Sequence, residues 1–198
     1  MGIRRGSIST PIIADGLVFN MDPANRASYV PNATTSFNTI DLSQSGTLEN
    51  GVAFIQPPIS SSCWDFDGSD DYIDCGNPTE LQITGALTIS CWVKRANISN
   101  NDQWFFCAGA SSPAWILGFR TADTLAFGDD DGNPFVTVTD RVFRDTSAWY
   151  HIVLTVKTSE SANANKYKIY VNGELQTTTF SGTAADTLLG ANVVHNIG

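Results

Sequence analysis

The residues with the clearest potential for chemistry form an acidic run in the second half of the chain. Asp129, Asp131 and Asn133 alternate there and could offer carboxylate and amide oxygens to one ion. Ca²⁺ prefers such hard oxygens on a flexible loop, and these residues have the spacing of the first three EF-hand ligands. The match stops at Pro134, where that loop needs glycine, and at Asp140, where it needs glutamate. A Ca²⁺ site therefore stays open beside the favoured interpretation, a solvated turn between two strands.

The chain shows no recognisable catalytic constellation. Glycosidases need two carboxylates at a set separation, one with a raised pKa, but the four glutamates stand isolated in the sequence. No Gly-x-Ser-x-Gly elbow and no phosphate-binding loop is present. His151 falls in an alternating segment and His195 lies near the end of the chain. We expect a protein that is not an enzyme.

The charge balance argues against two classes of partner. The net charge is −9, and only 11 lysines and arginines are scattered along 198 residues, too few to replace the counterions of a nucleic acid. No segment approaches the roughly 20 apolar residues of a membrane span, and residues 1–7 contain no apolar signal region. We expect no nucleic-acid partner, no membrane partner, and synthesis in a cytoplasm without a signal peptide.

The four cysteines are expected to be reduced and buried. They form no Cys-x-x-Cys pair, and with 2 histidines in the chain a zinc site is not favoured. Cys63–Cys75 and Cys91–Cys107 bridges remain alternatives.

Period-two alternation predicts many short strands and no convincing helix. It is strictest over residues 87–94 and 150–156, and Asn172-Gly173 predicts a two-residue hairpin turn. The acids between Phe66 and Asp74 are interpreted as a strand-turn-strand unit. Further strands are expected at residues 17–22, 37–42, 52–55, 104–108, 116–120, 124–128 and 135–139. Short strands separated by turns predict an all-β fold with two antiparallel sheets.

Four segments, taken in order, resemble a concanavalin A-like jelly roll of the laminin G type. They are residues 66–73 (FDGSDDYI), 87–94 (LTISCWVK), 149–154 (WYHIVL) and 170–175 (YVNGEL). Residues 14–22 (ADGLVFNMD) resemble the lead-in before such modules in bacteriophage structural proteins. The resemblance implies a jelly-roll sandwich over residues 16–198 behind an extended N-terminal docking arm, residues 1–15. The family usually adds a strand after Asn-Ile-Gly, so the final strand is expected to be missing here.

The resemblance also implies sugar recognition, in some members through Ca²⁺. Sugar rings stack on aromatic side chains, and Trp104 and Trp115 are candidate platforms, with Trp149 a further one. Trp115 follows Pro113 at the start of a strand and is expected to be partly exposed. The alternative for each tryptophan is a place in the core, where large aromatic residues dominate sandwich packing.

Three functions follow from these expectations. The favoured one is a bacteriophage virion structural protein, a capsid decoration or a head or tail fibre component, which docks on other virion proteins or on copies of itself through the arm. The alternative is an adhesin that recognises host glycans, with Ca²⁺ as a possible cofactor. A glucanase-like hydrolase is less favoured, because the acidic strand of those enzymes is missing.

Overall fold

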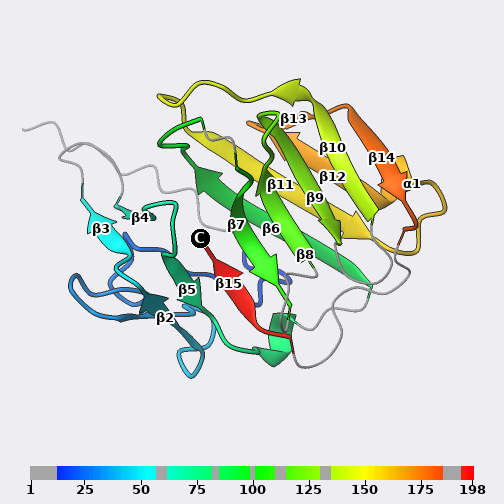
Figure 1. Cartoon of the computed structure of the whole chain (residues 1–198). Coiled ribbons are helices and arrows are strands. Elements are labelled where there is room, and N and C mark those ends of the chain that lie inside the picture. The colour runs from blue at the N-terminus through cyan, green and yellow to red at the C-terminus, as the bar shows by residue number, and fades with distance from the viewer. Residues whose placement is uncertain are drawn as a thin grey trace, which may run out of the picture.

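The computed structural model is a sandwich of two antiparallel β-sheets that lie face to face (Figure 1). It describes residues 13–56, 62–81, 85–98, 101–109, 115–129, 135–184 and 193–198. Asp131, Asn133 and most of the expected N-terminal arm lie outside these residues. The described part contains one short helix, α1 (Asn163–Lys166), and one 3₁₀ turn, η1 (Thr79–Leu81). The predicted all-β jelly-roll class is confirmed. No helix among these residues has the length and apolar character that a membrane crossing requires.

The larger sheet has nine strands and brings together segments far apart in sequence. Its order is β1-β2-β5-β15-β7-β8-β9-β10-β14, with every pair antiparallel. The strands are β1 (Thr35–Phe37), β2 (Ser45–Glu49), β5 (Tyr72–Asp74), β7 (Gln103–Ala108), β8 (Trp115–Phe119), β9 (Thr124–Asp129), β10 (Phe135–Val142), β14 (Thr178–Gly182) and β15 (His195–Ile197).

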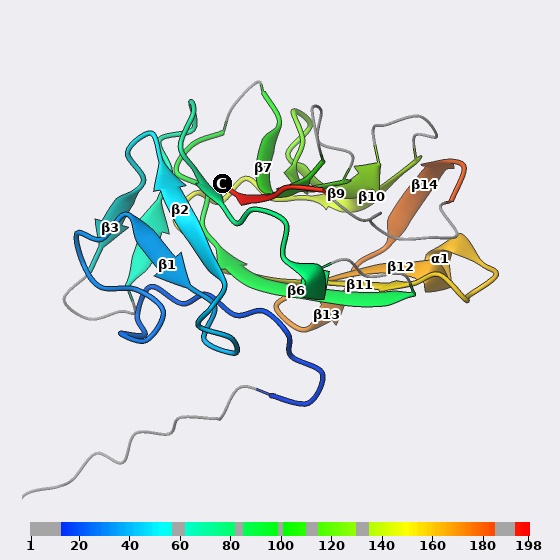
Figure 2. The ribbon, with the colours of Figure 1, turned by 90° about the horizontal axis from the view of Figure 1, so that it is seen from below.

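The smaller sheet covers one face of the larger one (Figure 2). Its order is β13-β12-β11-β6, with β6 at an edge. Its strands are β6 (Ala86–Val93), β11 (Tyr150–Lys157), β12 (Tyr167–Val171) and β13 (Glu174–Leu175). Asn172 and Gly173, both with positive φ (52° and 84°), form the predicted hairpin turn between β12 and β13. A separate two-stranded sheet pairs β3 (Ala53–Ile55) with β4 (Cys63–Asp65).

Aromatic rings from both sheets fill the space between them. Tyr167 of β12 stacks on Phe135 of β10 at 4.8 Å and on Phe180 of β14 at 5.8 Å. Trp115 of β8 packs against Phe127 and Phe135 at 5.1 and 5.6 Å. Alternation in β11 and β12 sends every second side chain into this layer. Burial of each large side chain stabilises the fold by roughly 2–3 kcal/mol, so the aromatic layer holds the two sheets together.

One end of the sandwich is closed by a buried arginine. Arg95 follows β6, and its Nη1 donates to Asp123 Oδ1 (3.0 Å) and to the Phe143 carbonyl (2.6 Å). Its Nε donates to Gln103 Oε1 (2.9 Å), and its guanidinium lies 4.7 Å from the Phe119 ring centre. These partners belong to the larger sheet and the segments beside its strands, so Arg95 ties the two sheets to each other.

The prediction of a first strand at residues 17–22 is wrong. The structure shows extended chain there without a ladder, since side chains satisfy the backbone instead. Asn38 Nδ2 donates to the Val18 carbonyl, and the Asn20 N–H donates to Asn38 Oδ1. The strand expected at residues 37–42 is shifted, because β1 ends at Phe37.

The end of the chain lies within the larger sheet. The last described strand, β15, lies in the interior of the nine-stranded sheet and pairs with β5 on one side and β7 on the other (Figure 1). Its first residue, His195, is 1% exposed between the sheets, and within the described residues neither ring nitrogen has a hydrogen-bond partner.

Candidate functional site

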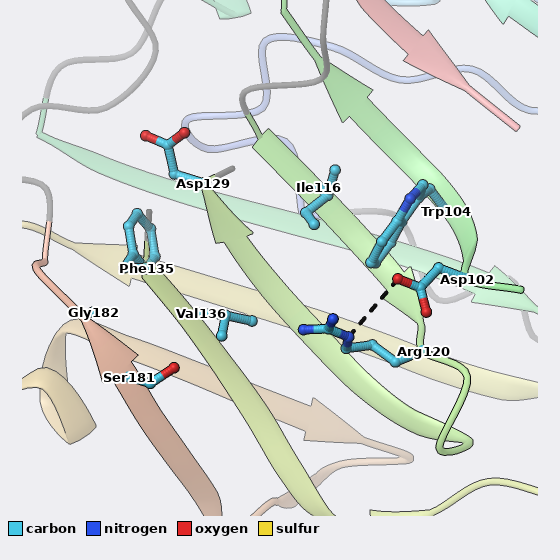
Figure 3. Close-up of a pocket in the computed structure, with 9 residues that line it drawn as sticks. All are labelled: Asp102, Trp104, Ile116, Arg120, Asp129, Phe135, Val136, Ser181 and Gly182. Carbon is cyan, nitrogen blue, oxygen red and sulfur yellow. Dashed lines mark ion pairs between the residues drawn. The ribbon is translucent and has the colours of Figure 1, made fainter. Parts of the chain in front are cut away.

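A groove lies on the face of the nine-stranded sheet that points away from the four-stranded sheet. Trp115 and Leu117 of β8 point into the core, so Ile116 and Gly118 belong to the opposite face. Trp104 of β7, paired with Gly118, stands on that face too. Figure 3 shows Trp104 and Ile116 beside each other above these strands, with Val136 of β10 across the groove. The groove has a volume of about 290 Å³.

Two glycines allow close packing within the strands that carry the groove. A Cβ on Gly118 would collide with the Gln103 carbonyl oxygen and lie 2.7 Å from the Trp104 Cα. The register of β7 against β8 shifts at this place, between Trp104 and Phe106. A Cβ on Gly128 would lie 2.5 Å from the Phe135 carbonyl oxygen. Gly118 therefore lets the Trp104 ring, which lies 2.8 Å from the position of that Cβ, pack directly on β8.

An ion pair borders the groove beside Trp104. Asp102 Oδ1 accepts the Thr121 N–H at 2.7 Å, and its Oδ2 lies 3.8 Å from Arg120 Nε. The Arg120 side chain extends over β9 toward Val136 (Figure 3). Asp102 precedes β7 and Arg120 follows β8, so the pairing of these two strands brings both charges next to the indole of Trp104.

The other end of the groove is lined by strand termini. Asp129 ends β9, Phe135 begins β10, and Ser181 and Gly182 end β14. The groove therefore offers an aromatic ring, a guanidinium, carboxylates and a hydroxyl beside the apolar side chains of Ile116 and Val136. Such a set can stack on an apolar ring face and hydrogen-bond to surrounding hydroxyls.

The structure brings together two of the residues singled out from sequence. Trp104 and Asp129 line the same groove. Asp131 and Asn133 lie outside the described residues, so the Ca²⁺ hypothesis stays a prediction.

The expectation that Trp115 is partly exposed is wrong. The residue is 4% exposed, because alternation along β8 sends its ring into the aromatic core.

Sequence reasoning did not single out Asp102, Arg120, Ser181 or the two glycines. The sequence could have pointed to the two glycines, because an isolated glycine inside a strand marks a bulge or a close approach of backbone. Gly118 and Gly128 both stand inside apolar strands. Asp102 and Arg120 carry no local pattern, because the pairing of β7 with β8 alone makes them neighbours.

A second acidic cluster lies in the turn before β5. Carboxylate oxygens of Asp67, Asp70 and Asp71 lie within 4.8 Å of one another. Asp67 Oδ1 accepts the Ser69 N–H (2.7 Å) and Asp71 Oδ2 accepts the Asp67 N–H (3.0 Å). These bonds support the interpretation that the acids shape a turn.

All four cysteines are free, as the sequence predicts. Burial raises the pKa of Cys75 and of Cys91 to about 12, and that of Cys107 to about 11. Thiols held in the protonated form are weak nucleophiles, so these three side chains act as small apolar residues.

A laminin G-type model of the concanavalin A-like lectin/glucanases superfamily matches residues 67–198. The chain belongs to this superfamily. Among solved structures, it is similar to the binding domain of Paraclostridial Mosquitocidal Protein 1, with 16% sequence identity and a TM-score of 0.60. The alignment covers 92% of this chain and 48% of that one, so this chain spans about half the length of that structure. No curated protein matches the chain.

Proposed function

We propose that this chain is a non-catalytic binding module that recognises a surface carbohydrate in the groove beside Trp104. The observation that carries the proposal is the placement of the Trp104 indole next to the Asp102–Arg120 pair in a groove that Ile116 and Val136 also line. A pyranose ring would lie against the indole, and its hydroxyls would bond to the carboxylate and the guanidinium. Membership of a superfamily that includes lectins supports this assignment.

The proposal excludes hydrolysis as the main activity. A glycosidase needs a carboxylic acid that keeps its proton near neutral pH. The Asp102 carboxylate instead accepts the Thr121 N–H and faces the Arg120 guanidinium. Asp102 is thus suited to accept hydrogen bonds from a ligand. Cleavage of a polysaccharide by the purified protein would contradict this part of the proposal.

Replacing Trp104 or Arg120 with alanine is expected to weaken glycan binding about 10- to 100-fold, as loss of a central aromatic or arginine anchor does in other interfaces. An array of bacterial and host surface glycans measures the binding. Arg141→Ala is the matched control, since Arg141 is also half exposed and faces a carboxylate, Glu174, at 3.9 Å, but does not line the groove. Unchanged binding by Trp104→Ala would refute the groove as the site.

A virion structural role is a second candidate, and a feature of the N-terminal part favours it. Large apolar side chains are exposed throughout residues 13–42. Ile13 is 83% exposed, Leu42 58% and Val30 54%, and three others are at least 38% exposed: Val18, Phe37 and Ile40. Six exposed apolar side chains within one stretch of the chain favour a contact surface there. In this role the protein would decorate a bacteriophage capsid or form part of a fibre, and the groove would serve adhesion.

Deleting residues 1–15 is expected to abolish incorporation into particles while the sandwich stays folded. The arm is the proposed docking element, whereas the aromatic core lies between sheets that begin at Thr35. Particle composition and the circular dichroism of the isolated protein measure the two effects. Normal incorporation of the shortened chain would argue against docking through the arm.

A further inference from the structure

The face of the four-stranded sheet that points to solvent carries an exposed tryptophan. Trp92 of β6 is 65% exposed. Because β6 is an edge strand within the described residues, the indole has a strand neighbour on one side only, in β11. Its other side is open. The exposed indole offers a large apolar face that a ligand could cover.

The neighbour that covers one face of the Trp92 indole is itself held in place. His151 pairs with Trp92 across the strands, and the two rings stack at 5.0 Å with an interplanar angle of 24°. His151 Nε2 lies 2.9 Å from Ser90 Oγ. The His151 N–H donates to Asn172 Oδ1 at 2.9 Å, and the Asn172 N–H donates to the His151 carbonyl at 2.8 Å. Trp92 is therefore preorganised, and binding requires little loss of side-chain freedom.

The surroundings of this pair fit a small ring better than a protein partner. Ser90 lies beside Trp92 on β6 and Val153 beside His151 on β11, and Thr88, Thr155 and Lys157 occupy outward positions further along the two strands. An aromatic side chain buries about 150–250 Å², whereas a stable protein interface buries about 800 Å² on each partner. A single flat ring with hydroxyl and amide groups beside it matches the apolar face and the hydroxyl rim of a pyranose.

We propose that Trp92 and His151 form a second carbohydrate contact, which takes one pyranose unit on the open face of the indole. The Ser90 hydroxyl and the Asn172 side-chain amide keep hydrogen-bonding capacity for the hydroxyls of that sugar. The inference rests on the proposed function, because it assigns a second site to the same class of ligand. The two contacts lie on opposite faces of the sandwich, since the groove belongs to the outer face of the other sheet (Figure 2). A short glycan cannot reach both, so the module would hold two chains.

The test compares the wild-type protein, Trp92→Ala, Trp104→Ala and the double variant on one array of bacterial and host surface glycans. Trp92→Ala is expected to lose at least tenfold in signal on a subset of glycans that Trp104→Ala still binds. Trp92→Phe, which keeps a flat ring, should retain most of that signal. Leu175→Ala is the control, since Leu175 is 57% exposed on β13 and two strands away from His151. Equal thermal midpoints exclude a folding defect.

Each outcome separates this inference from the proposed function. Binding that Trp104→Ala abolishes and Trp92→Ala leaves unchanged would overturn the second contact and keep the groove. Binding lost only in Trp92→Ala would support the second contact and refute the groove. A wild-type protein that binds no glycan on the array would overturn both.

Discussion

Replacing Arg95 with methionine is expected to lower the free energy of unfolding by about 3 kcal/mol, because it breaks a buried charge network from one side. The Arg95 side chain is 1% exposed. Methionine keeps much of its length but donates no hydrogen bond, so the Phe143 carbonyl and the Gln103 amide oxygen lose their partner. The substitution also removes the positive charge of Arg95 from the face of the Phe119 ring. Chemical denaturation at neutral pH measures the loss.

Arg144 provides a matched control for this prediction. Its Nε lies 2.8 Å from Asp123 Oδ2, the same carboxylate that Arg95 contacts, but its side chain is 64% exposed. The hydrogen bond from Arg144 is the main cause that lowers the pKa of Asp123, ahead of the bond from Arg95, while burial acts in the opposite direction. Arg144→Met should nevertheless lower the stability by less than about 1 kcal/mol, since water replaces an exposed partner. Equal losses of unfolding free energy in Arg95→Met and Arg144→Met would contradict the expectation that burial makes the contacts of Arg95 the more stabilising ones.

The second large effect expected is a loss of stability in mild acid that depends on His195. Burial lowers the pKa of His195 below its usual value of 6.5. The unfolded chain therefore takes up a proton near pH 6.5, whereas the folded chain does so only at lower pH. Between these two values the unfolded state binds more protons, so stability falls as the pH falls, by about 1.4 kcal/mol per pH unit from this residue. Above pH 6.5 its contribution is constant.

His195→Leu tests this prediction. Leucine has a similar volume and removes two ring nitrogens that have no hydrogen-bond partner in the described residues. At pH 8 the variant should equal or exceed the stability of the wild-type protein, because it leaves no buried polar atom unsatisfied. From pH 7 to 5 the difference between the two proteins should widen in favour of the variant. The free energy of unfolding of both proteins is measured by denaturation at each pH. A difference between them that stays constant from pH 7 to 5 would disprove the effect.

Local patterns in the sequence were sufficient for the individual strands. Alternation over residues 87–94 and 150–156 corresponds to β6 and β11, and Asn172-Gly173 forms the predicted turn. The hairpin expected around residues 121–123 joins β8 to β9. These features depend on side-chain period and on the φ that each turn residue tolerates, and both are properties of neighbouring residues.

The errors arose where partners distant in sequence decide the outcome. Residues 17–22 alternate like a strand, but the side chain of Asn38 takes the bonds that a ladder would need. Trp115 follows a proline near a turn, but its ring faces the other sheet and is buried. The three residues of β15 lie between β5 and β7, a position that no local pattern announces.

The sequence by itself determined the all-β class, most strands and the resemblance to laminin G-type modules, because period and turn chemistry are encoded within a few residues. Only the tertiary structure decided which side chains share a surface. Trp104 meets Arg120 because β7 pairs with β8, and Trp92 meets His151 because β6 pairs with β11 across more than fifty residues of chain. The physical reason is that strand pairing brings distant residues together, and the pleat then sends each side chain to the core or to solvent.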